Sequence, residues 1–586
     1  MRQWMVAAKK ADFYAIAEKF HVDPVVARII RNREVIGEKN IRIYLGGNLS
    51  DLSDPHQMKD MDRLVEILAQ KIRKQVRIRI IGDYDVDGVT SSHLFLMALR
   101  RVGAKVDVVI PHRIQDGYGL SLHLLQQAKE DGVDTILTCD NGIAAIDEIA
   151  WAKAQKMTVL VTDHHAVPFE EPEGRRTEKK SLADAVVNPH QQDCGYPYKE
   201  LCGAGVAWNV IRVLYENYDM DKREAEDLLD FVAMATVCDV MSLTGENRIL
   251  VKEGLKRIRH TKNIGLQALM QACNVQPENI SAYHFGYVLG PCVNATGRLD
   301  TARHALRLFE TGQETEAEEI ARDLVDLNQE RKELTLQGVE MAKKLCEEGG
   351  YENDPVLVLF LPDVHESIAG LIAGRIREMY NRPVFVLTRG EEGVKGSGRS
   401  TENYSMYENM CGCAELFTKF GGHPMAAGLF LPEENVEKFR RKINENCPLT
   451  VEEVCPDIHI DMAMPVGYAS TELVHQFALL EPFGKDNPSP LFADRNLSIS
   501  RMWLIGKNRN VLRMSVLSEY GQPVPVIFFG DVETLFAYFT EKFGQEEVEN
   551  ALHGRKNRIL FSMVYTAKID FYQGNENLQL EMKYYR

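Results

Sequence analysis

Short apolar runs alternate with amphipathic segments along the first half of the chain. The apolar runs are Thr135 to Cys139, Met157 to Val161 and Leu229 to Val237, and Arg77 to Ile81 is a further strand-like run. We interpret all four as strands, because runs of this length that are bounded by polar and glycine-rich segments are typical of a buried sheet. Their alternation with helix-like segments between 51 and 300 predicts an α/β domain, a parallel sheet covered by helices.

Each run is followed by acidic residues or histidines. The segments are Gly82-Asp83-Tyr84-Asp85-Val86-Asp87-Gly88, Asp140-Asn141-Gly142, Asp163-His164-His165 and Asp239. Because the carboxyl ends of parallel strands meet at one edge of a sheet, we expect these side chains to converge. Carboxylates and imidazoles held together can bind two divalent cations, which clamp the attacking and leaving oxygens of a displacement at phosphorus. The ligand types favour Mn²⁺ or Mg²⁺, so the pattern predicts a metal-dependent phosphoester hydrolase.

Each segment has a simpler interpretation when it is taken alone. An Asp after a strand often caps the next helix. The Asp-x-Asp-x-Asp-Gly spacing also occurs in calcium-binding loops, but an EF-hand has a helix before the loop, and here a strand-like run precedes Asp83. The metal-site interpretation therefore depends on the four segments occurring together.

The chain is too long for a single core, and further regions are predicted around the first α/β domain. Residues 1–50 are expected to form a helical extension with Phe13, Ile16 and Phe20 on one helix face. Residues 301–349 lack proline and carry many charges, which predicts a long connecting helix. Residues 350–450 are predicted to form a second α/β domain.

Two glycine-rich segments in this second domain, Lys395 to Ser400 and Gly421-Gly422-His423, are interpreted as turns. Turns of this kind let backbone amides approach an anion.

The last region, 456–586, changes to short alternating strands. The predicted strands are Val511 to Val516, Val524 to Phe529, Ile559 to Phe571 and Leu578 to Tyr584. A β-rich domain of this size fits an OB-like barrel, a fold that binds single strands through a positive groove and aromatic platforms. Phe528, Phe529, Tyr565 and Phe571 are candidate platforms, although alternating aromatic residues are more often part of a core.

Composition narrows the class of protein. The 586 residues are 45% hydrophobic and 26% charged, as in ordinary soluble proteins, and no apolar run is long enough to cross a bilayer, so we expect a cytoplasmic protein. The net charge of −16 argues against bulk attraction to nucleic acid, although a narrow basic channel remains compatible with it. Eleven scattered cysteines indicate neither a disulfide framework nor a structural zinc site.

Together the segments resemble the DHH phosphoesterase superfamily and, within it, the RecJ family of single-strand-specific exonucleases. The resemblance covers nearly the whole chain, and it implies two α/β lobes joined by a long helix plus a C-terminal OB-like β-barrel. The segments that narrow it to RecJ are Pro111-His112-Arg113 with Gly117 to Leu120, Asn188 to Gln191, Leu201 to Gly205, Leu289 to Pro291 with Gly297 to Asp300, Lys395 to Ser400, Phe420 to His423, and Glu481 to Gly484.

The resemblance also implies roles for individual residues. Asp140 would bridge two metal ions, and His165 would act near the scissile phosphate. Some relatives have a histidine ligand at the position of Ile81, and in this chain Asp83 would complete the first metal site instead. Departures from the usual pattern occur at Cys292, where arginine is common, and at Thr296, where alanine is. The implied metal ligands are Asp83, Asp85, Asp87, Asp140, His164 and Asp239, and the implied phosphate or DNA contacts are Arg113, Arg298, Ser397, Arg399, Gly422 and His423.

The expected activity is 5′-to-3′ degradation of single-stranded DNA to mononucleotides with Mn²⁺ or Mg²⁺, in DNA repair and recombination. The expected partners are single-stranded DNA and, at the level of hypothesis, a helicase and a single-strand-binding protein, with the enzyme itself a monomer. Two alternatives remain open. One is a DHH phosphodiesterase for short oligonucleotides or cyclic dinucleotides, and the other is a non-catalytic replication scaffold.

Overall fold

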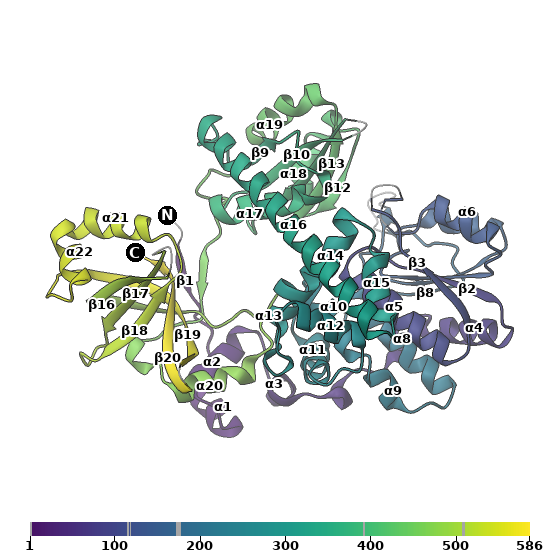
Figure 1. Ribbon diagram of the computed structural model, residues 1–586, viewed down its shortest axis with the longest axis horizontal. Helices are drawn as coiled ribbons and strands as arrows, with labels where there is room; N and C mark the ends of the chain where they lie inside the picture. The colour runs from purple at the N-terminus through teal and green to yellow at the C-terminus, as the bar shows by residue number, and fades with distance from the viewer. Residues whose placement is uncertain are drawn as a thin grey trace. The chain divides into compact units, whose positions relative to one another are not determined.

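The computed structural model describes residues 3–113, 116–117, 119–170, 177–390, 393–506, 510–572 and 574–586. The chain forms two compact units (Figure 1). The first unit comprises 52–241 and 249–456, and the second comprises 3–51, 242–248 and 457–586. The α/β lobes, the connecting helix and the terminal barrel implied by the sequence are all present, so the predicted fold class is confirmed.

The first lobe is built on a five-stranded parallel sheet of order β3-β2-β4-β5-β8. Three of the four predicted strands are confirmed, because β2, β4 and β5 fall on the runs identified in the sequence. Burial on both faces explains the mostly apolar character of β4 and β5. The strands are β2 (Arg77–Ile81), β3 (Lys105–Val109), β4 (Thr135–Cys139), β5 (Thr158–Thr162) and β8 (Ala185–Val187), and the main helices are α4 (Met61–Arg73), α5 (Val86–Arg101), α6 (Leu122–Glu130), α7 (Ile146–Ala154) and α8 (Gly203–Asn217).

The fourth predicted strand is wrong, because Leu229–Cys238 forms the helix α10. The first eight residues of this helix are buried and most of them are apolar, so its sequence carries no helical period. A short apolar run of this kind fits a buried helix as well as a buried strand. Asp239 consequently lies at the end of a helix and not of a strand.

A layer of helices continues the first lobe and leads into the second. The region predicted as one connecting helix contains two, with a break at 311–313. The long helix α16 packs against α12 and α14 of the first lobe and against α17 of the second. The bounds are α11 (Gly245–Ile258), α12 (Ile264–Ala272), α14 (Gly290–Leu299), α15 (Arg303–Glu310) and α16 (Glu314–Glu348).

The second lobe has a mixed sheet of order β12-β13-β11-β10-β9, in which β9 and β10 are parallel and the other pairs antiparallel. Both glycine-rich segments predicted to be turns are strands here. The glycines allow close packing, since an added Cβ at Gly396 would lie 2.5 Å from the Leu387 side chain. The elements are β9 (Leu357–Phe360), α17 (Ala369–Tyr380), β10 (Val384–Gly390), β11 (Gly393–Arg399), α18 (Met406–Cys411), β12 (Lys419–His423), β13 (Ala426–Leu431) and α19 (Val436–Glu445).

The second unit contains a closed barrel. The strand order β16-β17-β18-β20-β19 is completed by pairing between β16 and β19. The bounds are β16 (Phe492–Ile505), β17 (Val511–Leu517), β18 (Pro523–Phe528), β19 (Leu560–Tyr572) and β20 (Asn575–Tyr585), with α21 (Val532–Phe543) and α22 (Gln545–Leu552) between β18 and β19.

The N-terminal segment folds onto this barrel domain. Strand β1 (Trp4–Val6) pairs with β14 (Ile458–Ile460), and the helices α1 (Phe13–Phe20), α2 (Pro24–Asn32) and α3 (Glu38–Gly46) follow. The apolar face predicted from Phe13, Ile16 and Phe20 packs against the same core as the barrel. The extension is therefore part of the second unit.

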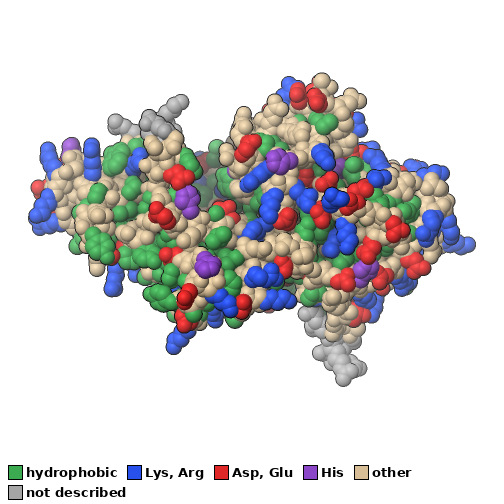
Figure 2. All heavy atoms as spheres, turned by 90° about the horizontal axis from the view of Figure 1, so that it is seen from below, with side chains coloured by type: hydrophobic (Ala, Val, Ile, Leu, Met, Phe, Trp, Pro, Cys, Tyr) green, Lys and Arg blue, Asp and Glu red, His purple; other side chains and the backbone are tan. Residues whose placement is uncertain are grey.

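Acidic and basic side chains are interspersed over the face that Figure 2 shows. Among the described residues no helix is long and apolar enough to cross a membrane.

Candidate active site

Three carboxylates come from the turn between β2 and α5 and from the first turn of α5. Asp83 is 2% exposed, and Asp85 caps the N-terminus of α5. Asp87 lies in the first turn of α5 and accepts hydrogen bonds from the backbone N–H groups of Gly203 (2.6 Å) and Ala204 (2.8 Å) at the start of α8. The start of α8 thus fixes the orientation of the Asp87 carboxylate.

Asp140 follows β4 directly and has a left-handed backbone conformation, with φ of 61°. Its side chain lies against α8 at a point where only glycine fits. A Cβ at Gly203 would lie 2.6 Å from the Cβ of Asp140. Gly203 therefore contributes both the approach of α8 to Asp140 and an N–H group to Asp87.

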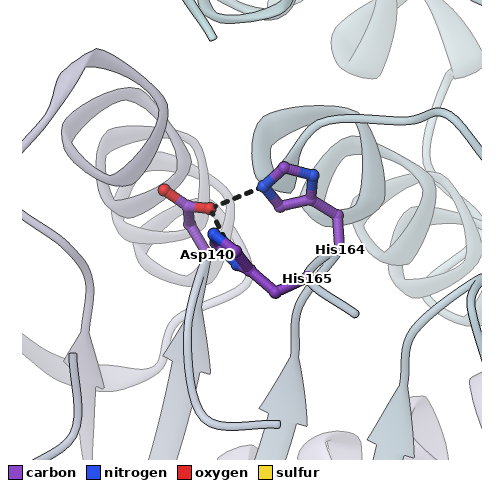
Figure 3. Close-up of side chains that lie close together, drawn as sticks. All are labelled: Asp140, His164 and His165. Carbon is purple, nitrogen blue, oxygen red and sulfur yellow. Dashed lines mark ion pairs between the residues drawn. The ribbon is translucent and has the colours of Figure 1, made fainter. Parts of the chain in front are cut away.

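The two histidines after β5 face Asp140, as Figure 3 shows. The His164 Nε2 atom lies 3.0 Å from the Asp140 Oδ1 atom, and the His165 Nδ1 atom lies 3.9 Å from it. Asp163 is buried and holds the pair in place, because its Oδ1 atom accepts hydrogen bonds from the His164 N–H (2.7 Å) and from the His165 ring (2.7 Å). Asp163 is therefore a positioning residue, a role that was not predicted from its place in the Asp-His-His motif.

Asp239 at the end of α10 completes the cluster. Its Oδ2 atom and the Asp87 Oδ2 atom each lie 3.6 Å from the His164 Nε2 atom. The structure therefore brings together all six residues that were predicted as metal ligands. Three sets of their ligand atoms lie close enough to share a cation: Asp83 with Asp85 and Asp140, Asp87 with His164 and Asp239, and Asp140 with His164 and His165.

The electrostatics of the cluster fit a bound cation. Burial, and then repulsion by neighbouring carboxylates, raises the pKa of Asp140 well above its usual value. The pKa of Asp83 is also raised well above its usual value, first by burial and then by the negative charge of Asp85. The Asp83 Oδ1 atom is buried and accepts no hydrogen bond from the described residues. A divalent cation reverses this penalty, because its charge favours the ionised carboxylates. The donor set of carboxylate oxygens and imidazole suits Mn²⁺ or Mg²⁺.

The pKa values of the two histidines are shifted in opposite directions. Burial lowers the pKa of His164, which suits a neutral imidazole ligand. Burial also opposes charge on His165, but the hydrogen bond and the charge of Asp163 dominate and raise the pKa of His165 to about 9. His165 is accordingly a candidate proton donor.

A cluster of arginines lies next to the carboxylates. The guanidinium of Arg113 stacks 4.7 Å from the centre of the Tyr84 ring, and Tyr84 separates Asp83 from Asp85 in the chain. Arg298 is held by a hydrogen bond from its Nη1 atom to the Ser367 carbonyl oxygen (2.6 Å). Burial lowers the pKa of the Arg298 guanidinium, and the charges of Arg113, Arg331 and Arg399 lower it further. Guanidinium groups that lie close together and repel one another form a site for an anion such as phosphate, to which each can donate two parallel hydrogen bonds.

The second lobe contributes Ser397 and Arg399 from β11. The Arg399 Nη1 atom donates to the Ser397 Oγ atom (3.3 Å) and to the Gly398 carbonyl oxygen (2.8 Å). The first turn of α17 lies against both side chains, because a Cβ at Gly370 would be 2.8 Å from Ser397 Oγ and 2.9 Å from Arg399 Nη2. The N-terminus of a helix also attracts anions, so α17 adds to this site.

Gly370 and Arg331 were not predicted as site residues from the sequence. Gly370 lies next to Ser397 and Arg399 only because the chain folds that way, and its local sequence has no feature that indicates a phosphate-binding role. Arg331 lies on α16, which was interpreted as a connector, and donates from its Nε and Nη2 atoms to the Asn328 Oδ1 atom (3.1 and 2.9 Å).

Gly422 and His423 lie on β12, the edge strand, with β13 between them and β11. They are therefore two strands away from Ser397 and Arg399.

Of the aromatic candidates in the barrel domain, Tyr565 and Phe528 belong to the core. The Tyr565 hydroxyl donates to the Met464 carbonyl oxygen (2.9 Å). Phe529 is 59% exposed and Phe571 is 70% exposed. Only these two of the four are accessible to a ligand.

Comparison with known proteins agrees with this architecture. The sequence model of the DHH family, N-terminal domain, matches residues 77–236, the DHHA1 domain matches 353–447 and the RecJ OB domain matches 460–584. The fold and the carboxylate-histidine cluster thus define a DHH phosphoesterase-type protein.

Comparison with individual proteins identifies the family within this class. The chain is 32% identical to the single-stranded-DNA-specific exonuclease RecJ of Haemophilus influenzae, over 96% of both chains. It is 33% identical to the protein of the same name from Bacillus subtilis, over 87% of this chain and 63% of that longer protein. The crystal structure of RecJ in complex with Mn²⁺ from Thermus thermophilus matches with a TM-score of 0.79 and 25% identity, over 100% of this chain and 79% of that one. The chain belongs to the RecJ family.

Proposed function

We propose that this protein is a metal-dependent exonuclease that degrades single-stranded DNA from its 5′ end to mononucleotides. The relatives that it matches over nearly its whole length are named single-stranded-DNA-specific exonucleases. The observation that carries the proposal is the contact between Arg113 and Tyr84. Through this contact the arginine cluster lies next to the carboxylates and histidines that can bind metal ions, and both clusters belong to the same compact unit. A strand end held by the arginines would place its first internucleotide phosphate near the carboxylates.

The six clustered side chains, Asp83, Asp85, Asp87, Asp140, His164 and Asp239, would hold two Mn²⁺ or Mg²⁺ ions. Asp140 belongs to two of the three candidate ligand sets, one with Asp83 and Asp85 and one with His164 and His165, so it would help to hold both ions. Bound cations supply Lewis-acid chemistry to the phosphodiester.

The phosphate-binding residues determine where the strand is cut. Arg113, Ser397 and Arg399, with the first turn of α17, would bind the terminal 5′ phosphate, and Arg298 would bind the phosphate at the cut. Water then attacks phosphorus, the bond to the 3′ oxygen of the first nucleotide breaks, and that oxygen leaves with a proton. The shortened strand keeps a 5′ phosphate, so the same residues can bind it again.

His165 is the candidate donor of that proton. Its Nδ1 atom is held by Asp163, which fixes the ring beside Asp140. Gly422 and His423, on the edge strand of the second lobe, are proposed to contact the strand farther from its end.

The proposal also assigns tasks to the regions of the chain. Residues 51–300 would carry out catalysis, 301–349 would connect the lobes, 350–450 would bind the 5′ phosphate, and 456–586 with the extension 1–50 would bind the single strand through its OB-type barrel. We further propose that the enzyme works as a cytoplasmic monomer in DNA repair and recombination, on strands supplied by a helicase or covered by a single-strand-binding protein.

The proposal can be tested with a panel of substrates in Mn²⁺: a long single strand, the matching blunt duplex and a dinucleotide. We expect mononucleotides from the long strand, almost none from the duplex, and none from any substrate with Asp140→Ala. Asp147→Ala, an exposed carboxylate in the following helix, is the matched control and should retain activity. Rapid hydrolysis of the dinucleotide without degradation of long strands would instead support the small-substrate enzyme, and inactivity on all substrates would support the scaffold.

A further inference from the structure

Two cysteines outside the metal cluster lie in contact in the first lobe. Cys273 follows α12, Cys292 lies on α14, and their Sγ atoms are 3.8 Å apart. A disulfide has an S–S length of about 2.05 Å, so side-chain rotation with a small shift of the helices would allow the bond to form. The contact brings together residues that are nineteen positions apart along the chain, one just after α12 and the other within α14.

The two thiols differ in the way expected of an attacking and a resolving pair. Cys273 is partly exposed, whereas Cys292 is 2% exposed. The hydrogen bond with Cys292 lowers the pKa of Cys273, and the same bond together with burial raises the pKa of Cys292. The thiolate is the reactive form, so Cys273 is the thiol that an oxidant reaches first.

The buried thiol is also linked to the arginine cluster. The Asn328 Nδ2 atom donates to the Cys292 Sγ atom (3.3 Å), and the Asn328 Oδ1 atom accepts from the Arg331 guanidinium. Arg331 is one of the charges that act on Arg298. Oxidation of the Cys292 sulfur would therefore disturb Arg331 through a single side chain, that of Asn328.

We infer that Cys273 and Cys292 form a reversible disulfide when a peroxide oxidises the protein, and that this bond weakens strand binding through Asn328 and Arg331. The Cys273 sulfur attacks the peroxide, the O–O bond breaks, and water leaves as the sulfur becomes a sulfenic acid. The Cys292 thiol then attacks that sulfur, the S–O bond breaks, and a second water leaves. The two thiols supply the two electrons that reduce the peroxide, and an external dithiol reverses the reaction.

The first test measures the bond itself and is independent of the proposed function. The metal-free protein is treated with hydrogen peroxide, alkylated, digested and analysed by mass spectrometry without reduction. We expect the peptides that contain Cys273 and Cys292 to be joined, and to separate after dithiothreitol. Recovery of both cysteines in alkylated form after oxidation would overturn the inference.

The second test measures the consequence and rests on the proposed exonuclease activity. Oxidation should raise the KM for a 5′-phosphorylated strand roughly tenfold, the effect of weakening one charged phosphate contact. Cys273→Ser should match the untreated enzyme and be insensitive to peroxide, whereas Cys411→Ser, which removes an exposed thiol in the second lobe, should stay sensitive. An oxidised enzyme that contains the disulfide but has an unchanged KM would overturn the link to the arginines.

Discussion

The guanidinium of Arg113 stacks on the ring of Tyr84, whose chain neighbours Asp83 and Asp85 belong to the candidate metal cluster. The residue proposed to bind the strand end is thus tied to the residues proposed to cut it. This relationship would hold a terminal phosphate at a fixed distance from the cut.

Replacing Arg113 should remove the preference for a phosphorylated end. Arg113→Ala should raise the KM for a 5′-phosphorylated strand about tenfold to a hundredfold, the cost of a lost charged hydrogen bond, and should change the KM for a 5′-hydroxyl strand little. Steady-state kinetics on the two strands measures this. Arg389→Ala removes an exposed arginine paired with Glu433 and should change neither value. Equal losses on both strands with Arg113→Ala would count against a role at the terminal phosphate.

Adding a methyl group at Gly203 should disrupt the metal cluster without removing any ligand. The new Cβ would lie 2.6 Å from the Asp140 Cβ and would displace the N–H group that holds Asp87. We expect Mn²⁺ affinity, measured by titration calorimetry, to fall about tenfold to a hundredfold. The control is Gly205→Ala, whose Cβ would have ordinary contacts of 3.4 Å with Leu201. Unchanged Mn²⁺ affinity in the Gly203 variant would show that α8 does not constrain the site.

Asp230 should make the first unit less stable as the pH rises. This carboxyl in α10 is buried, and burial raises its pKa to about 6 even though Thr261 donates a hydrogen bond to it (2.6 Å). Because the pKa is raised in the folded state, the stabilising contribution is complete below about pH 4 and is lost as the pH rises through about 6.

The variant Asp230→Asn removes this titration and can keep the hydrogen bonds. It should resemble the wild type at pH 4 and be more stable by up to about 3 kcal/mol at pH 7.5 (roughly two pKa units), as measured by urea unfolding. Asp227→Asn, an exposed neighbour, should show no such pH-dependent difference. A stability difference that does not vary with pH would contradict this explanation.

Arg248 should be essential to the second unit. It is 1% exposed and donates to the carbonyl oxygens of Tyr44, Leu479 and Leu480, each at 2.8 Å. Arg248→Met would leave these acceptors without their donor and should cost roughly 3 kcal/mol or more. Differential scanning calorimetry should show a lower transition temperature, while Arg42→Met, an exposed arginine of the same unit, should change it little. An unchanged transition would mean that packing alone holds these segments together.

The sequence predicted those parts of the site that local patterns mark. Asp83, Asp140 and His164 follow strands whose apolar runs are distinctive, and parallel strands bring such residues together. Asp239 was predicted as a ligand at the end of a strand, but it follows a buried helix whose sequence has no visible period.

Other parts of the site depend on contacts that no local pattern records. Arg331 reaches the arginine cluster only because α16 packs against α14, and Gly370 lies at the phosphate-binding candidates only because α17 covers β11. The closure of the barrel depends likewise on the pairing of Phe492 with Tyr565, far apart in the chain. Long-range packing determines these features.

The central claim is that the arginine cluster binds a 5′ end while the adjacent carboxylates cut one nucleotide away from it. The most direct measurement is a time course in Mn²⁺ with one long single strand, labelled in separate reactions at its 5′ or its 3′ end. The account predicts that the 5′ label appears at once as a mononucleotide, while the 3′ label stays in long products until late. Early release of the 3′ label, or cuts within the strand before either end is lost, would contradict it.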